Sequence, residues 1–507
     1  MIISHKHKFI FFKTRKTAGS SIQVQLAKYC GEDDIITGQY RDGIDDDSHS
    51  TGLNMDKFYT THPHPTLKET RLFLGEEIWN SYFKFAFVRN PYDIAVSRYF
   101  WEKRGKSTIE QETSVAGFRD WIKTELKDYD IQSSYVEWDD KIALDFIGRY
   151  ENLNEDYAYI CNKLNLPVDE LPTKKSGFRD KKHYTEFYKS DDDKNVVHNF
   201  FRKDIHHLGY SFNQKFVTKR IAPIILPKDL QKNNDNINGP SLIKVPDWVE
   251  NPLGKYYLYF AHHQGKYIKM SYSDNIEGPY TEYDKGTLRL ENTNCKTHIA
   301  SPDVHIDDDR KQIVMYYHGD TIDEQKTFVS FSKDGLNFKD SGNECGSFYF
   351  RVFKYKNKLY SISKNKNTDS VISVANNWED KFKPLFNFLE NSRHTSVFIE
   401  DDDLYIFYSS IGDCPESIKM IQIKLSENID DWDVIHMEEI LKPEREYEGS
   451  YFPLNPSLPG SSTLRYGRGV NEVRDPYVYV EDDNIYLFYS LAGEMGIGLS
   501  KLRRIKK

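Results

Sequence analysis

The sequence has few cysteines and no apolar run long enough to cross a membrane. Its five cysteines, Cys30, Cys161, Cys295, Cys345 and Cys414, are scattered, and no two of them form a CxxC pair. This excludes the usual spacing of a zinc site or a disulfide framework. A sparse, odd set of cysteines is typical of a reducing compartment, and the start MIISHKHKF lacks an apolar signal core. We therefore expect a soluble, cytoplasmic protein with no membrane partner.

The chain has no excess of positive charge either. Its 69 Lys and Arg residues are outnumbered by 78 Asp and Glu residues, which gives a formal net charge of −9. This argues against a nucleic-acid partner, and an anionic substrate would have to be bound by local cations. A length of 507 residues is too great for one hydrophobic core, so we expect two or more domains. The 35 Tyr and 31 Phe residues favour β structure in part of the chain.

Residues 8–25, KFIFFKTRKTAGSSIQVQ, form the most informative motif. The apolar run Phe9–Phe12 predicts a buried strand, which a basic, hydroxyl-rich loop connects to a helix. At such a helix N-terminus, backbone N–H groups without intrahelical partners can bind an anion. Lys16 adds a cation, but it precedes Gly19, whereas the lysine of a Walker A motif follows the glycine. We expect the anion to be contacted by Lys16, Thr17, Ala18, Gly19, Ser20 and Ser21.

A second motif, FAFVRNPYDIAVSRY, covers residues 85–99. We expect a strand over Phe83–Val88, then a turn and a helix. This arrangement places Arg89 just after the strand and Ser97 on the helix, where both can contact one phosphate group. Strand and helix signals alternate through residues 1–215, which predicts an α/β domain with a parallel sheet.

In their order and separation, the two motifs resemble those of the carbohydrate-type sulfotransferases, which use 3′-phosphoadenosine 5′-phosphosulfate as co-substrate. Further similar segments, such as HPTLKETRLFLG from His64 and FIGRYEN at 146–152, extend the resemblance over residues 5–212. It implies that the first loop binds the 5′-phosphosulfate and that Arg89 and Ser97 bind the 3′-phosphate. It also implies that a carbohydrate hydroxyl is the acceptor.

The resemblance further implies the catalytic groups. His64 would be the general base that accepts the proton of the acceptor hydroxyl, with His62 as the alternative. Lys16 would stabilise the charge that develops on the bridging oxygen. Tyr184 would either contact the nucleotide or be a packed aromatic side chain. No metal is expected in this domain.

The second half of the chain has a different pattern. Residues 216–236 contain two prolines followed by a polar stretch, and we place a linker there. From 237 to 507 the pattern is all-β, and five apolar strands each follow another strand across a short turn. These strands cover 256–263, 313–319, 359–364, 404–410 and 485–491. Hairpins that repeat around an axis form a propeller, and the five units resemble the five-bladed propellers of arabinanase-like and invertase-like glycosidases.

In such propellers, the inner strands direct acidic residues into a central pocket. Asp303, Glu472 and Asp475 are candidates for the opposed carboxylates of a hydrolase, but Asn238 stands where the resemblance implies a catalytic aspartate. The Arg and His content suits an anionic or sulfated sugar, and each residue could equally form a polar contact that closes a blade. The expected pocket residues are Asn238, His298, Asp303, His305, Arg351, Arg393, His394, Glu472, Arg474 and Asp475.

The sequence thus predicts a sulfotransferase domain followed by a five-bladed propeller. Two hypotheses are open for the propeller: a glycosidase-like enzyme that acts on the same glycan, or a non-catalytic sugar-binding module that presents the acceptor. For the whole chain, the alternative is a glycoside hydrolase or carbohydrate-binding protein whose transferase domain is degenerate.

Overall fold

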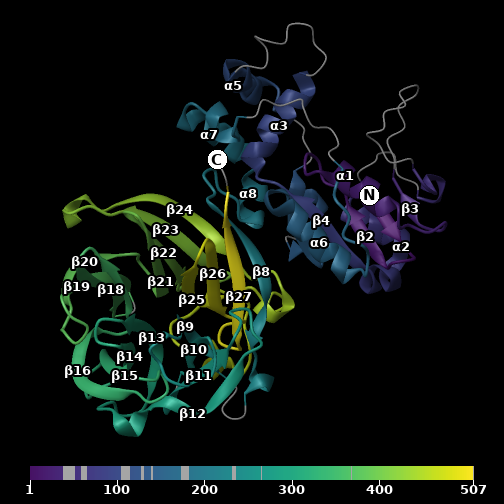
Figure 1. The fold of residues 1–507 in the computed structure, drawn as a ribbon. Coiled ribbons are helices and arrows are strands. Elements are labelled where there is room, and N and C mark those ends of the chain that lie inside the picture. Colours follow the sequence, from purple (N-terminus) through teal and green to yellow (C-terminus); the bar gives the residue numbers. More distant parts are fainter. Residues whose placement is uncertain are drawn as a thin grey trace. The chain divides into compact units, whose positions relative to one another are not determined.

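A computed structural model of the protein describes residues 1–37, 52–58, 65–103, 115–126, 131–138, 141–172, 182–230, 236–263, 265–366 and 368–505. Two compact units are present, built mainly from Met1–Gln214 and from Lys215–Arg504 (Figure 1). The first is an α/β unit and the second is entirely β in its main elements.

The first unit contains a five-stranded sheet in the order β3-β1-β2-β4-β7. The predicted strands 9–12 and 83–88 are confirmed as β2 and β4. β4 lies between β2 and β7 and is parallel to both. The full set is β1 (Ile2–Ser4), β2 (Phe9–Phe12), β3 (Ile35–Ile36), β4 (Phe83–Val88) and β7 (Phe146–Arg149).

The sheet is mixed, which corrects the prediction of a parallel sheet. β1 pairs antiparallel with both β2 and β3. Only a short turn separates β1 from β2, and Lys8 in this turn has a φ of 53°. A parallel connection needs a crossover of a dozen residues or more. The short turn between β1 and β2 can therefore only form a hairpin.

Alternating side chains of β2 divide the sheet into two buried faces. Phe9 and Phe11 pack in a core with residues of α1 and α6, whereas Ile10 and Phe12 pack in a core with residues of α2. The helices are α1 (Gly19–Ala27), α2 (Leu67–Ser81), α3 (Pro91–Lys103), α5 (Val115–Thr124), α6 (Leu153–Lys163), α7 (Asp191–Phe200) and α8 (Arg202–Leu208). A small hairpin, β5 (Glu137–Trp138) and β6 (Lys141–Ile142), completes the described elements of this unit.

The second unit is a five-bladed propeller, as predicted. It consists of five four-stranded antiparallel sheets, and Figure 1 shows inner strands such as β9 and β13 near the centre and outer strands such as β16 and β20 at the rim. Blade 1 is β9 (Asn238–Lys244), β10 (Tyr256–Ala261), β11 (Tyr267–Ser273) and β12 (Thr281–Arg289). Blade 2 is β13 (Ile299–Asp307), β14 (Gln312–Asp320), β15 (Gln325–Ser332) and β16 (Lys339–Ser347).

The remaining three blades follow the same plan. Blade 3 is β17 (Arg351–Tyr355), β18 (Lys358–Asn365), β19 (Asp369–Ala375) and β20 (Lys383–Phe388). Blade 4 is β21 (Ser392–Glu400), β22 (Asp403–Ser410), β23 (Ile418–Lys424) and β24 (Asp433–Leu441). Blade 5 is β25 (Arg474–Glu481), β26 (Asn484–Ser490), β27 (Ile497–Arg504) and β8 (Phe216–Ile225).

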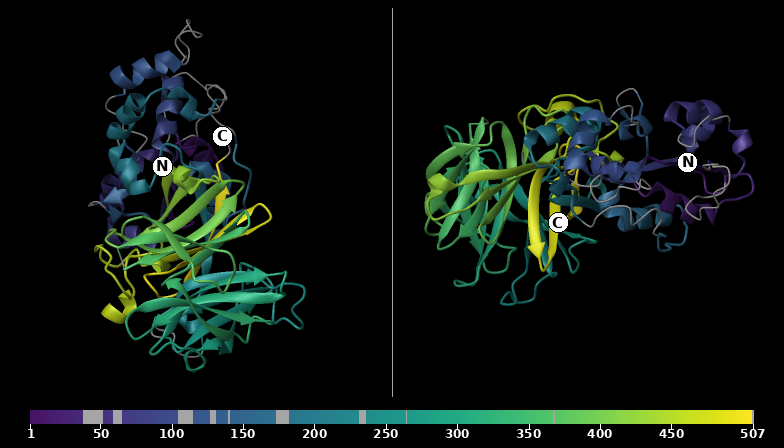
Figure 2. Two further views of the ribbon diagram at one scale, coloured as in Figure 1. Left: turned by 90° about the vertical axis from the view of Figure 1, so that its left-hand side faces the viewer. Right: turned by 90° about the horizontal axis from the view of Figure 1, so that it is seen from above.

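The outer strand of blade 5 comes from the beginning of the unit. β8 pairs antiparallel with β27 along its whole length, and it lies in teal beside the yellow β27 (Figures 1 and 2). The prediction of a linker over 216–236 is therefore wrong for 216–225. These residues form a strand because β27 would otherwise expose an unpaired edge.

The inner strands are connected to one another by side chains that accept backbone hydrogen bonds. Val304 N donates to Ser241 Oγ at 3.0 Å, and Val352 N donates to Asp303 Oδ2 at 2.7 Å. Ser396 Oγ accepts a third bond of this kind from blade 5. These polar contacts fix the inner ring on which the central residues lie.

Candidate functional site

The loop between β2 and α1 presents backbone N–H groups at the carboxyl edge of the sheet. Lys16 and Ala18 both have left-handed backbone conformations, with φ of 62° and 61°. Ala18 caps α1 without a side-chain hydrogen bond. Thr14 and Thr17 fold back into the loop, where their hydroxyl oxygens lie 2.7 Å apart. The N-terminus of α1 is thus capped by no side chain, the arrangement that suits an anion.

Arg89 joins the second motif to this loop. It follows β4, whose neighbour in the sheet is β2, so the two loops leave parallel strands at one edge. The guanidinium Nη1 of Arg89 donates to the carbonyl oxygen of Lys16 at 3.0 Å and lies 3.5 Å from Ser97 Oγ. The half-buried Lys16 has its Nζ 4.5 Å from the centre of the Trp101 ring on α3. The structure therefore brings both motifs together.

Neighbouring side chains fix the charge and direction of Arg89. Asp93, one helical turn later, accepts from Nε at 2.8 Å and from Nη2 at 2.7 Å, and the Tyr150 ring lies 3.9 Å from the guanidinium carbon. Burial alone would lower the pKa of Arg89, but the Asp93 carboxylate, with Tyr150 and Glu151, raises it above its ordinary value. The arginine is therefore a permanent cation held in one orientation.

The backbone of Arg89 is also held from both sides. Gln132 accepts a hydrogen bond from Arg89 N at 2.7 Å and donates one to Arg89 O at 2.8 Å. Asp204 in turn accepts from the backbone N–H of Gln132 and of Ser133, both at 2.8 Å. Burial raises the pKa of Asp204, although these hydrogen bonds oppose the shift. This network positions the strand end from which Arg89 extends.

The propeller contains a cavity of about 440 Å³ to which all five blades contribute. Its lining includes Arg393 and His394 of blade 4 and Asp475 of blade 5, which were predicted. It also includes Lys364 and Glu494, which were not predicted. Tyr349, Phe348 and His263 are among the further lining residues. Aromatic rings beside carboxylates and cations are the usual components of a polar ligand site.

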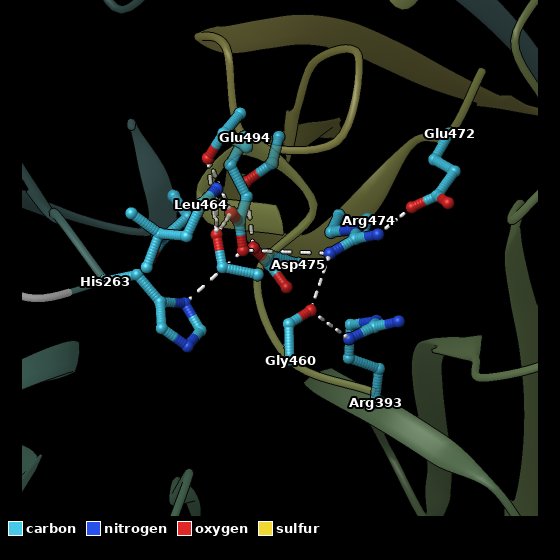
Figure 3. A network of polar contacts seen from close by, with 12 residues as sticks. His263, Arg393, Gly460, Leu464, Glu472, Arg474, Asp475 and Glu494 are labelled. Atoms are coloured by element: carbon cyan, nitrogen blue, oxygen red, sulfur yellow. Dashed lines mark hydrogen bonds and ion pairs between the residues drawn. The ribbon is translucent and has the colours of Figure 1, made fainter. Parts of the chain in front are cut away.

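Beside this cavity, Arg393 and Arg474 both donate to the carbonyl oxygen of Gly460, and both pair with carboxylates (Figure 3). Arg474 forms ion pairs with Glu472, with Glu416 at 3.5 Å and with Glu494 at 3.7 Å. Arg393 Nε donates to Glu416 at 2.8 Å. The carbonyl oxygen of Gly460 accepts from Arg393 at 3.2 Å and from Arg474 at 3.5 Å. Arg474 is only 1% exposed, so its charge is compensated almost entirely by these partners.

The carboxylates around the cavity are held in their ionised form. Burial alone would raise the pKa of Asp475, but His394 and the two arginines hold it well below its usual range. Burial would likewise raise the pKa of Glu494, but a hydrogen bond from His263 and the charge of Arg474 lower it to about 2. Burial lowers the pKa of His394, so its ring is neutral near pH 7.

Comparison with known families assigns the first unit. Residues 1–211 match the model of a family described as the sulfotransferase family. This part of the chain is a sulfotransferase domain. The match ends where β8 and the propeller begin. The loop at Lys16 and the Arg89 contact therefore both lie within the sulfotransferase domain.

Two curated proteins show sequence similarity to the chain. An uncharacterized protein of Acanthamoeba polyphaga mimivirus is 33% identical over 304 residues, which cover 53% of this chain and 84% of the relative. An uncharacterized protein of Archaeoglobus fulgidus is 34% identical over 101 residues, 19% of this chain and 78% of the relative.

Solved structures that resemble the chain include glycoside hydrolases. A thermostable family-43 glycoside hydrolase has a TM-score of 0.36 at 16% identity and covers 53% of this chain and 89% of that one. The exo-beta-1,3-galactanase of Phanerochaete chrysosporium has a TM-score of 0.39 at 10% identity, covering 58% and 65%. The catalytic domain of the Coprinopsis cinerea GH62 alpha-L-arabinofuranosidase has a TM-score of 0.40 at 12% identity, covering 57% and 97%. The five blades are evident from the strand pairing alone.

Other residues predicted for the sulfotransferase domain have varied surroundings. Ser20 is half-buried and Ser21 buried on the first turn of α1. The Tyr184 hydroxyl accepts from Asn90 at 3.3 Å and donates to the carbonyl oxygen of Phe212, so it supports the turn after Arg89. His62 and His64 lie outside the described residues. The role of either histidine therefore stays a prediction.

Sequence analysis missed the groups that hold Arg89. Asp93 could have been found, because it lies four residues after Arg89, the spacing of an ion pair on a helix. Nothing in the sequence pointed to these roles of Gln132 and Asp204. Gln132 contacts Arg89 only in the fold, and Asp204 in turn contacts Gln132.

Several predicted pocket residues connect blades instead of lining the cavity. Arg351 donates to carbonyl oxygens of Thr395 and Pro302, both at 3.0 Å, and of Pro240 at 3.4 Å. Asp303 Oδ2 lies 2.8 Å from His305 Nε2 and accepts from the backbone N–H of Val352 at 2.7 Å. The predicted residues that are not among the cavity lining are Asn238, His298, Asp303, His305, Arg351, Glu472 and Arg474.

The described residues include neither a metal-binding cluster nor a membrane-spanning helix. Over the described ranges, no group of three His, Cys, Asp or Glu side chains is placed to hold a metal ion. The helices in the part of the chain that the structure describes are all too short or too polar to cross a bilayer.

Proposed function

We propose that the protein transfers a sulfuryl group from 3′-phosphoadenosine 5′-phosphosulfate to a hydroxyl group of a carbohydrate, and that the propeller binds the acceptor glycan. The observation that carries the proposal is the contact between Arg89 and the carbonyl oxygen of Lys16. It places the arginine after β4 against the loop before α1, so that two cationic side chains lie at one edge of the sheet. A donor with phosphate groups at both ends needs such a surface.

In the proposed reaction, the acceptor oxygen forms a bond to sulfur while the bond from sulfur to the bridging phosphate oxygen breaks. Lys16 and the N–H groups at the start of α1 stabilise the negative charge that develops on this bridging oxygen. Arg89 and Ser97 hold the 3′-phosphate and so fix the position of the donor. The acceptor proton goes to a base, for which His64 is the predicted residue and His62 the alternative.

The chemistry of the cavity favours glycan binding over glycan hydrolysis. A glycosidase needs one carboxyl group that is protonated near neutral pH to serve as general acid. Burial alone would raise the pKa of Asp303, Asp475 and Glu494. Their cationic or hydrogen-bonding neighbours outweigh this effect and lower the pKa of each. Glu472 is paired with the buried Arg474. These carboxylates serve the fold as counterions, so we propose a binding module.

A transfer assay with the ³⁵S-labelled donor and a panel of unsulfated oligosaccharides tests this function. We expect label to appear on at least one oligosaccharide, and Arg89→Ala to lower the rate at least about tenfold, since a charged hydrogen bond contributes roughly 1.5–3 kcal/mol. Arg71→Ala, which removes a surface ion pair with Glu76 on α2, is the matched control and should retain the rate.

The second candidate function has its own outcome in the same experiment. If no oligosaccharide is labelled and a glycoside is instead hydrolysed, with activity lost in Asp303→Asn or Glu472→Gln, the protein is a hydrolase with a degenerate transferase domain.

A further inference from the structure

Lys364 in the propeller cavity has a positive charge that the protein does not neutralise. It lies on β18, lines the cavity and is only 2% exposed. Its Nζ donates to the carbonyl oxygen of Ser392 at 2.6 Å, and within the described ranges it forms no ion pair with a carboxylate. Burial, with the charge of Arg393, lowers the pKa of Lys364 to about 8, although Glu416 and Asp369 oppose the shift. A buried ammonium of this kind lacks a counterion.

The carboxylates of the cavity are already satisfied by other groups. Asp475 faces His394 and accepts from Ser490 Oγ at 3.0 Å. Glu494 accepts from Asn236 Nδ2 at 2.7 Å and from Thr463 Oγ1 at 3.0 Å. The third, Glu324, pairs with Lys326 at 2.6 Å on the adjacent strand β15. The protein therefore assigns each of these carboxylates to a partner other than Lys364.

His394 provides a second sign of a missing ligand. It is 8% exposed, lines the same cavity and turns Nδ1 toward Asp475. Its Nε2 is buried and has no hydrogen-bond partner. The edge of the ring packs against Tyr349, whose centroid is 4.0 Å away, so the ring is held in this orientation. Buried polar atoms in native proteins are rarely left unpaired, so a ligand group is expected at Nε2.

We propose that this cavity binds a sulfated sugar, with the sulfate group beside Lys364 and a hydroxyl group of the sugar donating to His394 Nε2. A sulfate ester carries a single negative charge, which matches the one buried ammonium among the described residues of the lining. The partly exposed rings of Tyr349 and Phe348 offer apolar surface to the sugar. This inference rests on the proposed function, because it makes the ligand of the propeller a product of the same reaction. The protein would then act on glycans that are already sulfated.

Chemical modification of the intact protein tests the proposal without a mutation. Acetic anhydride reacts with the deprotonated amine, and the lowered pKa of Lys364 increases the fraction of that form near neutral pH. Mass spectrometry measures acetylation at each lysine. The probes are sulfated mono- and disaccharides, each paired with its unsulfated parent sugar, and inorganic sulfate. We expect the sulfated sugars to protect Lys364 at least about fivefold better than their parents. Lys358, exposed at the start of the same strand, is the internal control and should be unaffected.

The other outcomes separate the possible ligands. Equal protection by parent and sulfated sugars would overturn the proposal, as would no protection by either. Protection by inorganic sulfate alone would show a site for a free oxyanion and overturn the assignment to a sugar. In calorimetry, Lys364→Met should lose the preference for sulfated sugars, whereas Lys358→Met should keep it.

The donor site is assayed separately by binding of 3′-phosphoadenosine 5′-phosphate, which Lys364→Met should leave unchanged. If the wild-type protein protects Lys364 as expected but does not bind this nucleotide, the proposed transferase function fails and the sulfated-sugar site stands. If it binds the nucleotide but shows no protection, the sulfated-sugar site fails and the transferase function stands.

Discussion

At the scale of single residues, two buried arginines illustrate two ways to hold a charge. Arg89 has one carboxylate partner, Asp93, and its remaining contacts are a backbone carbonyl, a hydroxyl and an aromatic ring. Arg474 has three carboxylate neighbours and is fully enclosed. The first arrangement leaves a cation at the edge of a loop, where a ligand can meet it. The second neutralises the cation and serves stability.

Arg474→Met should therefore destabilise the propeller strongly. The change removes the ion-pair partner of the buried Glu472, whereas Glu416 keeps Arg393. An unpaired buried charge costs about 3–5 kcal/mol. Arg310→Met is the matched control, because its ion pair with Glu379 lies at the surface and should be worth no more than about 1 kcal/mol. Urea unfolding followed by tryptophan fluorescence measures both free energies. Equal losses in the two variants would contradict this account of Arg474.

Glu494→Gln should reduce the sensitivity of the propeller to acid. Burial alone would raise the pKa of Glu494, but the hydrogen bond from His263 and the charge of Arg474 lower it to about 2, below an unfolded value of about 4.3. A depressed folded pKa contributes stability above the unfolded pKa, and this contribution is lost as the pH falls toward about 2. The wild-type free energy of unfolding should thus fall more steeply between about pH 5 and pH 3 than that of the variant. Parallel curves would rule out this role for Glu494.

At the scale of elements, local patterns predicted the strands well and the connections poorly. The run Phe9–Phe12 coincides with β2, and the five predicted second strands of the blades correspond to β10, β14, β18, β22 and β26. These segments are apolar enough to be recognised by themselves. The strand β8 was missed because Pro223 and Pro227, followed by a polar stretch, are typical of a loop, and only the pairing with β27 makes it a strand.

Part of the candidate site could likewise be predicted and part could not. Lys16, Arg89 and Ser97 follow from motif order alone, and the fold brings them together. Asp303 and Arg351 were expected in the pocket, yet they bridge inner strands, because polar side chains near the axis also have to satisfy the backbone of the next blade. Sequence patterns do not distinguish a polar side chain that lines the pocket from one that bridges two blades. For the same reason they did not indicate that Lys364 lines the cavity.

Gly148→Ala should destabilise the sheet of the sulfotransferase domain. A Cβ at this position of β7 would lie 2.5 Å from Cε1 of the buried Phe87 ring on β4. Overpacking of this kind costs about 1–3 kcal/mol. Phe87→Leu provides the control, because a smaller side chain makes room for the new methyl group. In a double-mutant cycle by urea unfolding, Gly148→Ala should cost less in the Phe87→Leu background, and an unchanged cost would exclude the clash.

At the scale of the whole molecule, the chain closes its propeller with a strand from the start of the second unit. β8 completes blade 5, while the other three strands of that blade come from the end of the chain. Arg220 on β8 also pairs with Glu448 at 2.7 Å and with Glu444 at 3.0 Å. The boundary of the propeller is therefore at Lys215 and not after residue 236.

Two truncations test this boundary. The fragment 215–507 should unfold in one cooperative transition, because it retains all twenty blade strands. The fragment 227–507 lacks β8 and leaves the edge of β27 unpaired, so it should aggregate or lose cooperativity. Circular dichroism during heating and size-exclusion chromatography measure both properties. Equal behaviour of the two fragments would show that β8 is dispensable.

The most direct test of the central claim is calorimetric binding of 3′-phosphoadenosine 5′-phosphate to the full-length protein. We expect the wild-type protein to bind one nucleotide per chain in a saturable manner. Lys16→Ala and Arg89→Ala should each weaken binding at least about tenfold, which corresponds to roughly 1.4 kcal/mol or more. Arg71→Ala should leave the affinity unchanged. Absence of binding by the wild-type protein, or equal affinity in all four proteins, would contradict the central claim.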